Sequence, residues 1–154
     1  MKYNLNLYNC FRRYSIKYRV AKVMLSLVIL LLGGFIYVIF RDKSLLMFNW
    51  FNTIGVGNEV DGLRRLFQGE GIYGWVKNSL PDGLWLFSYM FIIDAIWGKS
   101  KSISFYLFIS LLPLIAIISE FLQFFDLCPG TFDWVDVASY LFAILLYITI
   151  KLLK

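Results

Sequence analysis

Four stretches of the chain are almost wholly apolar, and more polar segments separate them. They cover residues 20–40, 80–97, 103–122 and 135–153. A helix needs roughly 20 mostly apolar residues to cross about 30 Å of hydrocarbon, and each stretch approaches that length. The pattern predicts an all-α membrane protein, in which a single transmembrane domain (residues 1–154) folds as a bundle of four transmembrane helices.

The first stretch is the clearest, because residues 25–40 carry no charge. A secretory signal peptide is the alternative interpretation. Its apolar segment would be about 7–15 residues long and would end at a small-x-small cleavage site, and residues 20–40 meet neither condition. We therefore expect this helix to stay in the mature protein, with Gly33 and Gly34 allowing close packing of another helix.

The composition agrees with a membrane setting. Hydrophobic residues make up 60% of the chain and charged residues only 16%, which is too apolar for an ordinary soluble domain of this size. The lipid bilayer is the expected partner, and no nucleic-acid partner is predicted. The chain has no histidine, which excludes imidazole acid–base chemistry and the commonest zinc ligand. Cys10 and Cys128 lack metal-ligand spacing, so no metal site is predicted and any cofactor stays unknown.

Basic residues are distributed unevenly among the polar segments. Ten lysines and arginines and no acid lie in the segment up to the first turn of the first stretch, in the link between the second and third stretches, and in the last residues of the chain from Lys151 onward. By the positive-inside rule, both termini are predicted to be cytoplasmic, and residues 41–79 form an outer loop of a multi-pass plasma-membrane protein. Asp94 is then near the cytoplasmic side, where Lys99 or Lys101 can pair with it.

The predicted outer loop is 39 residues long and should contain structure of its own. Residues 44–55 are too short and too aromatic for a span, and they suit the headgroup region. Farther on, Val60, Leu63 and Phe67 share one helical face, which predicts a short amphipathic helix at the membrane surface. Arg64 and Arg65 beside that face are candidates for contacts with phosphates or lipid headgroups.

Acidic and polar side chains gather where the third and fourth apolar stretches meet. At about 1.5 Å per residue, Glu120 lies at the outer end of the third helix, and Gln123 follows on the same face. Asp133, Asp136 and Tyr140 share one face of the fourth helix, within an arc of roughly 80°. A short connection makes these helices antiparallel neighbours, so the two faces can meet. The second helix begins at the same end, and the predicted binding residues are Glu120, Gln123, Asp133, Asp136, Tyr140 and Asp82.

Most of these residues also have a structural explanation. Asp133 and Asp136 stand where a helix start favours carboxylates, and Asp82 follows a predicted N-cap at Ser79. The amide and the phenol of the set can simply pack or hydrogen-bond between helices. Glu120 differs, because it lies near the C-terminal end of its helix, where negative charge is unfavourable. An ionisable residue at this depth favours a functional interpretation.

The segments "EFLQ" and "GTFDWVDVASY" resemble the VanZ-like family of small bacterial membrane proteins. That family's pattern is Glu-x-x-Gln, a short loop, Arg-x-x-Asp-x-x-Asp, and then Asn and Gly in the next helix. "SLPDGLWLFSYMF" is also similar to a segment of some distant members. The chain departs from the pattern at three positions, where it has Gly130, Tyr140 and Ala143. The matched positions are Glu120, Gln123, Asp133 and Asp136.

The resemblance implies a multi-helix bundle in the bacterial plasma membrane, and one namesake of the family is associated with low-level resistance to teicoplanin. It leaves two functions open. The first is an envelope protein whose polar outer pocket binds a cell-surface molecule, a lipid-linked ligand or a partner subunit. The alternative is a membrane enzyme acting on a lipid-linked or cell-wall precursor, with Glu120 or Asp136 as general base or with carboxylates holding a divalent cation.

Overall fold

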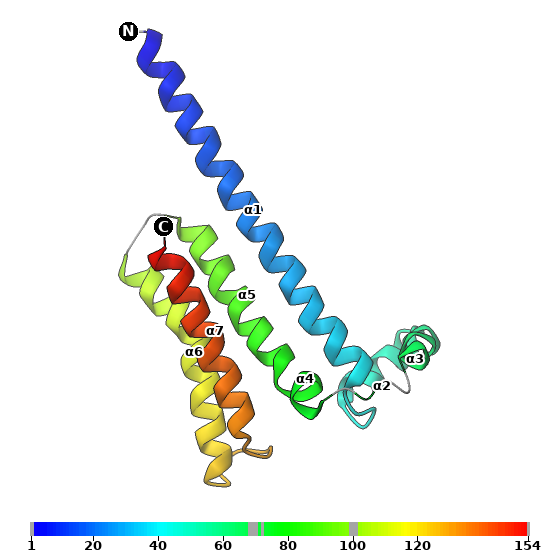
Figure 1. Ribbon diagram of the computed structural model, residues 1–154. Helices are drawn as coiled ribbons and strands as arrows, with labels where there is room; N and C mark the ends of the chain where they lie inside the picture. The colour runs from blue at the N-terminus through cyan, green and yellow to red at the C-terminus, as the bar shows by residue number, and fades with distance from the viewer. Residues whose placement is uncertain (1, 68–70, 72, 99–101, 154) are drawn as a thin grey trace.

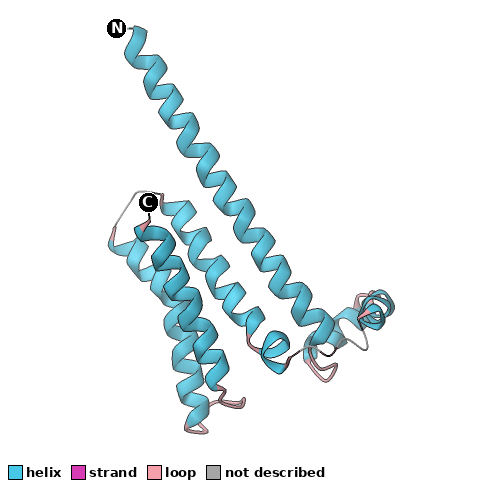
Figure 2. Cartoon of the chain, in the orientation of Figure 1, coloured by secondary structure: helices cyan, strands magenta, loops and turns pink. Residues whose placement is uncertain are grey.

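The computed structural model describes residues 2–67, 71, 73–98 and 102–153, with side chains from residue 16 onward. Every regular element in these ranges is an α-helix (Figures 1 and 2). The long helices alternate in direction, and the C-terminus lies at the end of the bundle where α5 ends and α6 begins (Figure 1). The helices are α1 (Lys2–Phe40), α2 (Leu46–Thr53), α3 (Gly57–Leu66), α4 (Gly74–Asn78), α5 (Leu80–Trp97), α6 (Ile103–Phe124) and α7 (Trp134–Leu152).

Three helical segments are long and apolar enough to cross a membrane, namely Ile16–Phe40, Ile103–Phe124 and Trp134–Leu152. They correspond to the first, third and fourth predicted spans. The second predicted span forms α5, an 18-residue helix that is not among the three. Two aspartates reduce its apolar character, and its position explains why it can carry them. Helices α1, α6 and α7 all pack against α5, so most of its surface faces protein.

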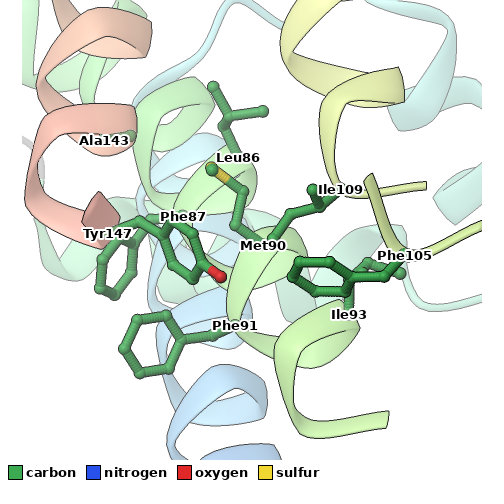
Figure 3. Close-up of a cluster of buried hydrophobic side chains, with 9 residues drawn as sticks. All are labelled: Leu86, Phe87, Met90, Phe91, Ile93, Phe105, Ile109, Ala143 and Tyr147. Atoms are coloured by element: carbon green, nitrogen blue, oxygen red, sulfur yellow. The ribbon is translucent and has the colours of Figure 1, made fainter. Parts of the chain in front are cut away.

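The hydrophobic core is built around α5. Its large apolar side chains fill the space between the helices, and α6 and α7 supply the opposing surfaces (Figure 3). The rings of Phe91 and Tyr147 meet edge to face, with centroids 6.0 Å apart. The buried members are Leu86, Phe87, Met90, Phe91, Ile93, Phe105, Ile109, Ala143 and Tyr147.

Small residues set the closest approaches of the helices. A Cβ atom added to Gly33 would lie 2.7 Å from the indole nitrogen of Trp85, so α1 and α5 depend on the missing side chain there. Gly34 faces open space, so only one of the two predicted packing glycines makes such a contact. A Cβ atom on Gly83 would lie 3.2 Å from the backbone oxygen of Ser139, which marks the close approach of α5 and α7.

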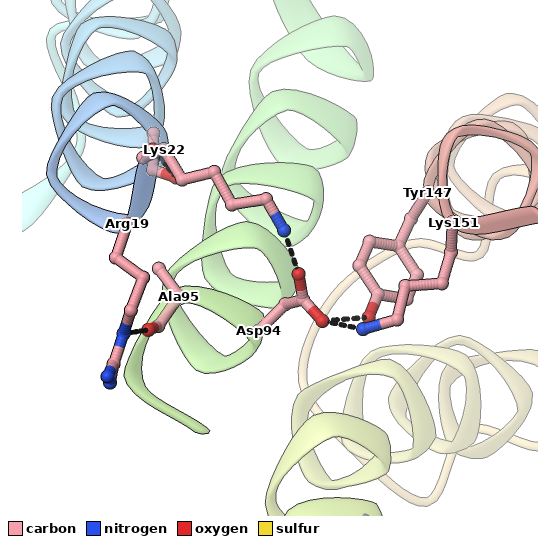
Figure 4. A network of polar contacts seen from close by, with 7 residues as sticks. Arg19, Lys22, Asp94, Ala95, Tyr147 and Lys151 are labelled. Carbon is pink, nitrogen blue, oxygen red and sulfur yellow. Dashed lines mark hydrogen bonds and ion pairs between the residues drawn. The ribbon is translucent and has the colours of Figure 1, made fainter. Parts of the chain in front are cut away.

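A buried carboxylate joins three helices near the C-terminal end of α5. Asp94, only 2% exposed, pairs with Lys22 of α1 and Lys151 of α7 (Figure 4). The hydroxyl of Tyr147 also donates to Asp94 Oδ1 at 3.3 Å. Arg19 completes this end of the bundle, because its guanidinium donates to the carbonyls of Ala95 and Ile96 in the last turn of α5.

The predicted partners of Asp94, Lys99 and Lys101, lie outside the described residues. The pairs that the structure does describe come from lysines far away in the sequence, and together they satisfy a charge that would be very costly to bury alone.

The predicted outer loop contains α2, α3 and α4. The amphipathic segment predicted around Val60 and Leu63 forms α3, and the ring of Phe67 just after it packs edge-on against Phe35 and Phe40 of α1. In α2, Trp50 is 62% exposed, which suits a side chain in contact with lipid headgroups. These contacts hold the loop against the end of α1.

Candidate functional site

Glu120 is buried near the end of α6 and reaches the start of α7. Its side chain is only 5% exposed, and its Oε2 accepts the backbone N–H of Asp133 at 3.4 Å. Asp133 is the N-cap of α7, because its Oδ1 accepts the N–H of Val135 at 2.8 Å. The capping explanation considered for Asp133 is thus what the structure describes. Glu120 has no cation among the hydrogen bonds and ion pairs of the described residues.

Three carboxylates and a phenol converge at this end of the bundle. The charges of Asp136 and Glu120 act on Asp82, and all three carboxylates act on the hydroxyl of Tyr140. We call this group, from α5, α6 and α7, the acidic cluster: Asp82, Glu120, Asp136 and Tyr140. The guanidinium of Arg41, at the end of α1, also acts on Asp82 and is the nearby opposing charge.

One oxygen of the acidic cluster has no protein partner within the described ranges. Oδ1 of Asp136 is buried and accepts no hydrogen bond there. Asp136 lies in the first turn of α7, where the free amides and the helix dipole favour its negative charge. A buried acceptor that is left unsatisfied costs about 1–3 kcal/mol, so this oxygen is suited to accept a hydrogen bond from a bound molecule.

The start of α5 differs in one detail from the sequence prediction. Ser79 is its N-cap residue and Pro81 stands in its first turn, but the hydroxyl of Ser79 makes no capping hydrogen bond. The predicted side-chain cap is therefore wrong. The reason is conformational: Ser79 has φ −100° and ψ −30°, the α-helical region rather than the extended region that N-cap residues usually adopt, because α4 runs directly into α5.

The side-chain contact that the structure describes for Gln123 is with the turn after α6. Its side-chain amide packs over the turn after α6, where a Cβ atom on Gly130 would lie 2.7 Å from its carbon. Gly130 has a φ of +133°, which side-chain-bearing residues rarely adopt. The VanZ-like pattern has arginine at this position, and an arginine would be strained in the backbone conformation observed here. The contact gives Gln123 a packing role at the turn.

The acidic cluster does not form a metal-binding group in the part of the chain that the structure describes. No three acidic or cysteine side chains there come close enough to share one ion. Glu120 already accepts one hydrogen bond, and ionised carboxylates can accept further hydrogen bonds and attract positive charge. The arrangement is therefore suited to bind amino or hydroxyl groups of a ligand.

A second polar site, which the sequence prediction did not define, lies at the end of α1. It is a cleft of about 700 Å³ that we call the basic cleft. Its cations are Arg41, Lys43, Arg64 and Lys77, and Phe40, Asp42 and Asn78 complete the lining. The sequence signal that could have indicated it is the set of basic residues in the segment 41–79, of which the prediction singled out only Arg64 and Arg65.

The two arginines proposed for phosphate contact have different positions. Arg64 lines the basic cleft and donates to the carbonyls of Val38 and Arg41, so it caps the end of α1. Its guanidinium also lies 4.8 Å from the ring centre of Phe48. Arg65 is exposed on α3 and does not line the cleft.

Two carboxylates, Asp42 in the lining of the basic cleft and Asp61 beside it, are held in their charged form. Hydrogen bonds from Ser44 lower the pKa of Asp42. The hydrogen bond from Lys43, whose Nζ lies 2.6 Å from Oδ1 of Asp61, lowers the pKa of Asp61. Lys43 is thus partly neutralised, while the part of the structure described here shows no ion pair for Arg41 or Lys77.

An apolar cavity of about 620 Å³ lies between α1, α4, α5 and α7. Nearly all of its lining surface is hydrocarbon, and its lining includes two serines, Ser79 and Ser139. The hydroxyl of Ser139 donates to the carbonyl of Asp136, whereas Ser79 is 1% exposed and its hydroxyl has no hydrogen-bond partner among the described residues. Residues that line the cavity include Ile29, Trp75, Ser79, Phe87, Phe142 and Leu146.

Comparison of the chain with protein-family models, with curated proteins and with solved structures gives no match. The resemblance to the VanZ-like family therefore stays a hypothesis based on the residues quoted above.

Proposed function

We propose that this chain is a VanZ-like multi-pass protein of the bacterial plasma membrane that binds a cell-surface or lipid-linked ligand through the acidic cluster. Glu120 carries the proposal: a buried carboxylate near the C-terminal end of a helix, where the dipole opposes its charge, with no cation beside it among the described ion pairs. Such a charge destabilises the fold unless binding uses it. Asp82 and Asp136 then supply further acceptors.

The proposed topology has four spans with both termini in the cytoplasm. Three apolar helices support a multi-pass arrangement, and α5 would complete the fourth crossing in their midst. The network around Asp94 would then lie toward the cytoplasm, and the acidic cluster and the basic cleft would lie toward the outside.

Thiol labelling tests this orientation. Cys128 is a free cysteine in the turn between α6 and α7, with its side chain partly exposed. A membrane-impermeant maleimide should label Cys128 in intact cells, and Cys128→Ser should abolish that labelling. Labelling of Cys10 alone in intact cells would reverse the orientation.

Binding is tested in proteoliposomes with a fluorescent polyprenyl-diphosphate-linked peptidoglycan precursor as the probe. We expect the wild-type protein to bind it and Glu120→Gln to weaken binding by about tenfold, since a charge-assisted hydrogen bond is lost. Asp126→Asn is the matched control, because Asp126 is an exposed carboxylate in the nearby turn and should leave binding unchanged. Equal binding by all three proteins would overturn the proposal for the acidic cluster.

The same assay separates binding from catalysis. Binding without release of products, unaffected by a chelator, supports the binding function. Turnover of the precursor that Glu120→Gln abolishes would replace it with the enzymatic alternative.

A further inference from the structure

The basic cleft and the apolar cavity meet at one short helix. Lys77 and Asn78, at the end of α4, line the basic cleft, whereas Trp75 and Ser79 line the apolar cavity. The two sites are therefore separated only by the width of α4. One molecule with a polar part and an apolar part could occupy both.

The charge of the basic cleft favours an anion. Four cations and one carboxylate, Asp42, line it, so its net charge is +3. Arg41 is oriented by Asn78, whose side-chain oxygen accepts from Nη1 at 3.1 Å, and by the ring of Tyr37. Arginine beside lysine is the combination that proteins use for phosphate groups.

The depth of the two sites matches the layers of a bilayer. The apolar segment of α1 ends at Phe40, so Arg41 and the basic cleft stand at the level of the headgroups. Ile29, in the lining of the apolar cavity, lies twelve residues earlier, about 18 Å deeper along the helix. The polar site thus lies at phosphate depth and the apolar site at acyl-chain depth.

Ser79 supplies a separate observation that points to a ligand. Its hydroxyl is buried, lacks a partner among the described residues and lines the apolar cavity directly after the cleft residue Asn78. The other serine of the lining, Ser139, already donates to the carbonyl of Asp136, so Ser79 has the hydroxyl that can donate to an ester carbonyl. In a glycerophospholipid, an ester carbonyl lies between the phosphate and the acyl chain.

From these features we propose that one anionic glycerophospholipid binds across α4. Its phosphodiester lies in the basic cleft, an ester carbonyl accepts from Ser79, and an acyl chain fills the apolar cavity. The site uses other residues than the acidic cluster, so it does not rest on the function proposed above. The proposed lipid site explains why the predicted outer loop carries basic residues in the cleft, which the positive-inside rule does not explain.

Native mass spectrometry of the full chain released from detergent tests the proposal. The probes are dilauroyl phosphatidylglycerol, dilauroyl phosphatidylcholine and glycerol 3-phosphate. We expect phosphatidylglycerol to bind best, and Lys77→Gln to raise its Kd by about tenfold through loss of a charge-assisted contact. Arg65→Gln removes an equal charge from the same loop outside the cleft and should change Kd less than about twofold.

A second pair of variants tests the acyl-chain site. Ala138 lines the apolar cavity and is exposed, so Ala138→Trp can fill the cavity without disturbing the core. We expect it to weaken phosphatidylglycerol binding and to leave glycerol 3-phosphate binding unchanged. Ser79→Ala should weaken phosphatidylglycerol binding by a smaller factor and should leave glycerol 3-phosphate binding unchanged.

Each other outcome overturns a stated part. If Lys77→Gln and Arg65→Gln weaken phosphatidylglycerol binding equally, the effect comes from the overall surface charge and not from the basic cleft. If glycerol 3-phosphate binds as tightly as the lipid, the basic cleft binds phosphate but the acyl chain adds nothing to affinity. If phosphatidylcholine binds as tightly as phosphatidylglycerol, the net charge of the lipid does not determine binding. Glu120→Gln should bind phosphatidylglycerol like the wild type, which keeps this result separate from the acidic cluster.

Discussion

Two acidic residues near the C-terminal ends of helices, Asp94 in α5 and Glu120 in α6, have opposite surroundings. Both are buried and both face the unfavourable end of a helix dipole. Asp94 is joined by two lysines and a tyrosine hydroxyl (Figure 4). Glu120 receives one backbone N–H and shares its surroundings with other carboxylates.

The difference separates a structural charge from a functional candidate. At the Asp94 end, opposing charges from α1 and α7 satisfy the carboxylate and tie three helices together. At the Glu120 end, like charges gather and Oδ1 of Asp136 has no partner in the described structure. The first arrangement stabilises the fold, whereas the second costs stability and leaves acceptors for another molecule.

The largest expected effect on stability comes from removing the charge of Asp94. Asp94→Asn leaves Lys22 and Lys151 close together without their counter-charge, and we expect a loss of about 3–5 kcal/mol in the free energy of unfolding. Reversible unfolding in mixed micelles measures it. A triple variant with Asp94→Leu, Lys22→Met and Lys151→Met should recover most of the loss, because it removes the buried charges together. A loss below 1 kcal/mol in Asp94→Asn would contradict the structural role.

A smaller loss of stability is expected from a substitution that separates α5 and α7 near the acidic cluster. Gly83→Val places side-chain atoms against the backbone of Ser139, so α5 and α7 must separate, at a cost of about 1–3 kcal/mol. The same separation moves Asp82 away from Asp136. The variant should therefore weaken binding of the polyprenyl-linked probe as well as stability. Gly62→Val is the control for the bare substitution, because no atom lies within 4 Å of a Cβ at that glycine.

At Glu120 we expect the opposite effect on stability from removing the charge. Glu120→Gln keeps an oxygen that can accept the N–H of Asp133 but removes the charge, and we expect a gain of about 1 kcal/mol in unfolding free energy. The same mixed-micelle measurement compares it with Asp94→Asn. A gain in stability together with a loss of probe binding would sharpen the contrast between the two ends. A loss of stability would show that the Glu120 charge also supports the fold.

The helices were well predicted, because long apolar runs reflect a local property. The predicted stretch 103–122 lies within α6 (Ile103–Phe124), and 80–97 coincides with α5. The meeting of Glu120 with the start of α7 was also predictable, since a short connection forces neighbouring helices together.

What the sequence could not supply was pairing between distant segments. The lysines that pair with Asp94 lie 72 and 57 residues away, and no local pattern selects them over Lys99 or Lys101. The basic cleft has the same origin, because it combines the end of α1 with residues of α3 and α4. The prediction placed Gln123 with the acids because it shares a face with Glu120, and the contact of its amide with Gly130 depends on a turn whose backbone the sequence did not define.

The smallest expected effect is on lipid binding at the basic cleft, where an acidic side chain pairs with one of the cations. Asp61 neutralises part of Lys43, a cation of the basic cleft, through an exposed pair. Asp61→Asn should free that charge and tighten phosphatidylglycerol binding by less than about fivefold, as expected for a surface pair. Ser44→Ala is a control on the same side of the cleft that leaves the Lys43–Asp61 pair in place.

The pH dependence tests the same contact. Lys43 lowers the pKa of Asp61, so the pair is present above the ordinary value of 3.8 and is lost as the pH falls through the lowered value. A phosphodiester stays ionised over this range. Wild-type affinity for phosphatidylglycerol should therefore rise at the acidic end of a titration, relative to Asp61→Asn, until the two proteins bind alike. Parallel titrations over the whole range would show that Asp61 does not restrain Lys43, and that the cleft already presents its full positive charge at neutral pH.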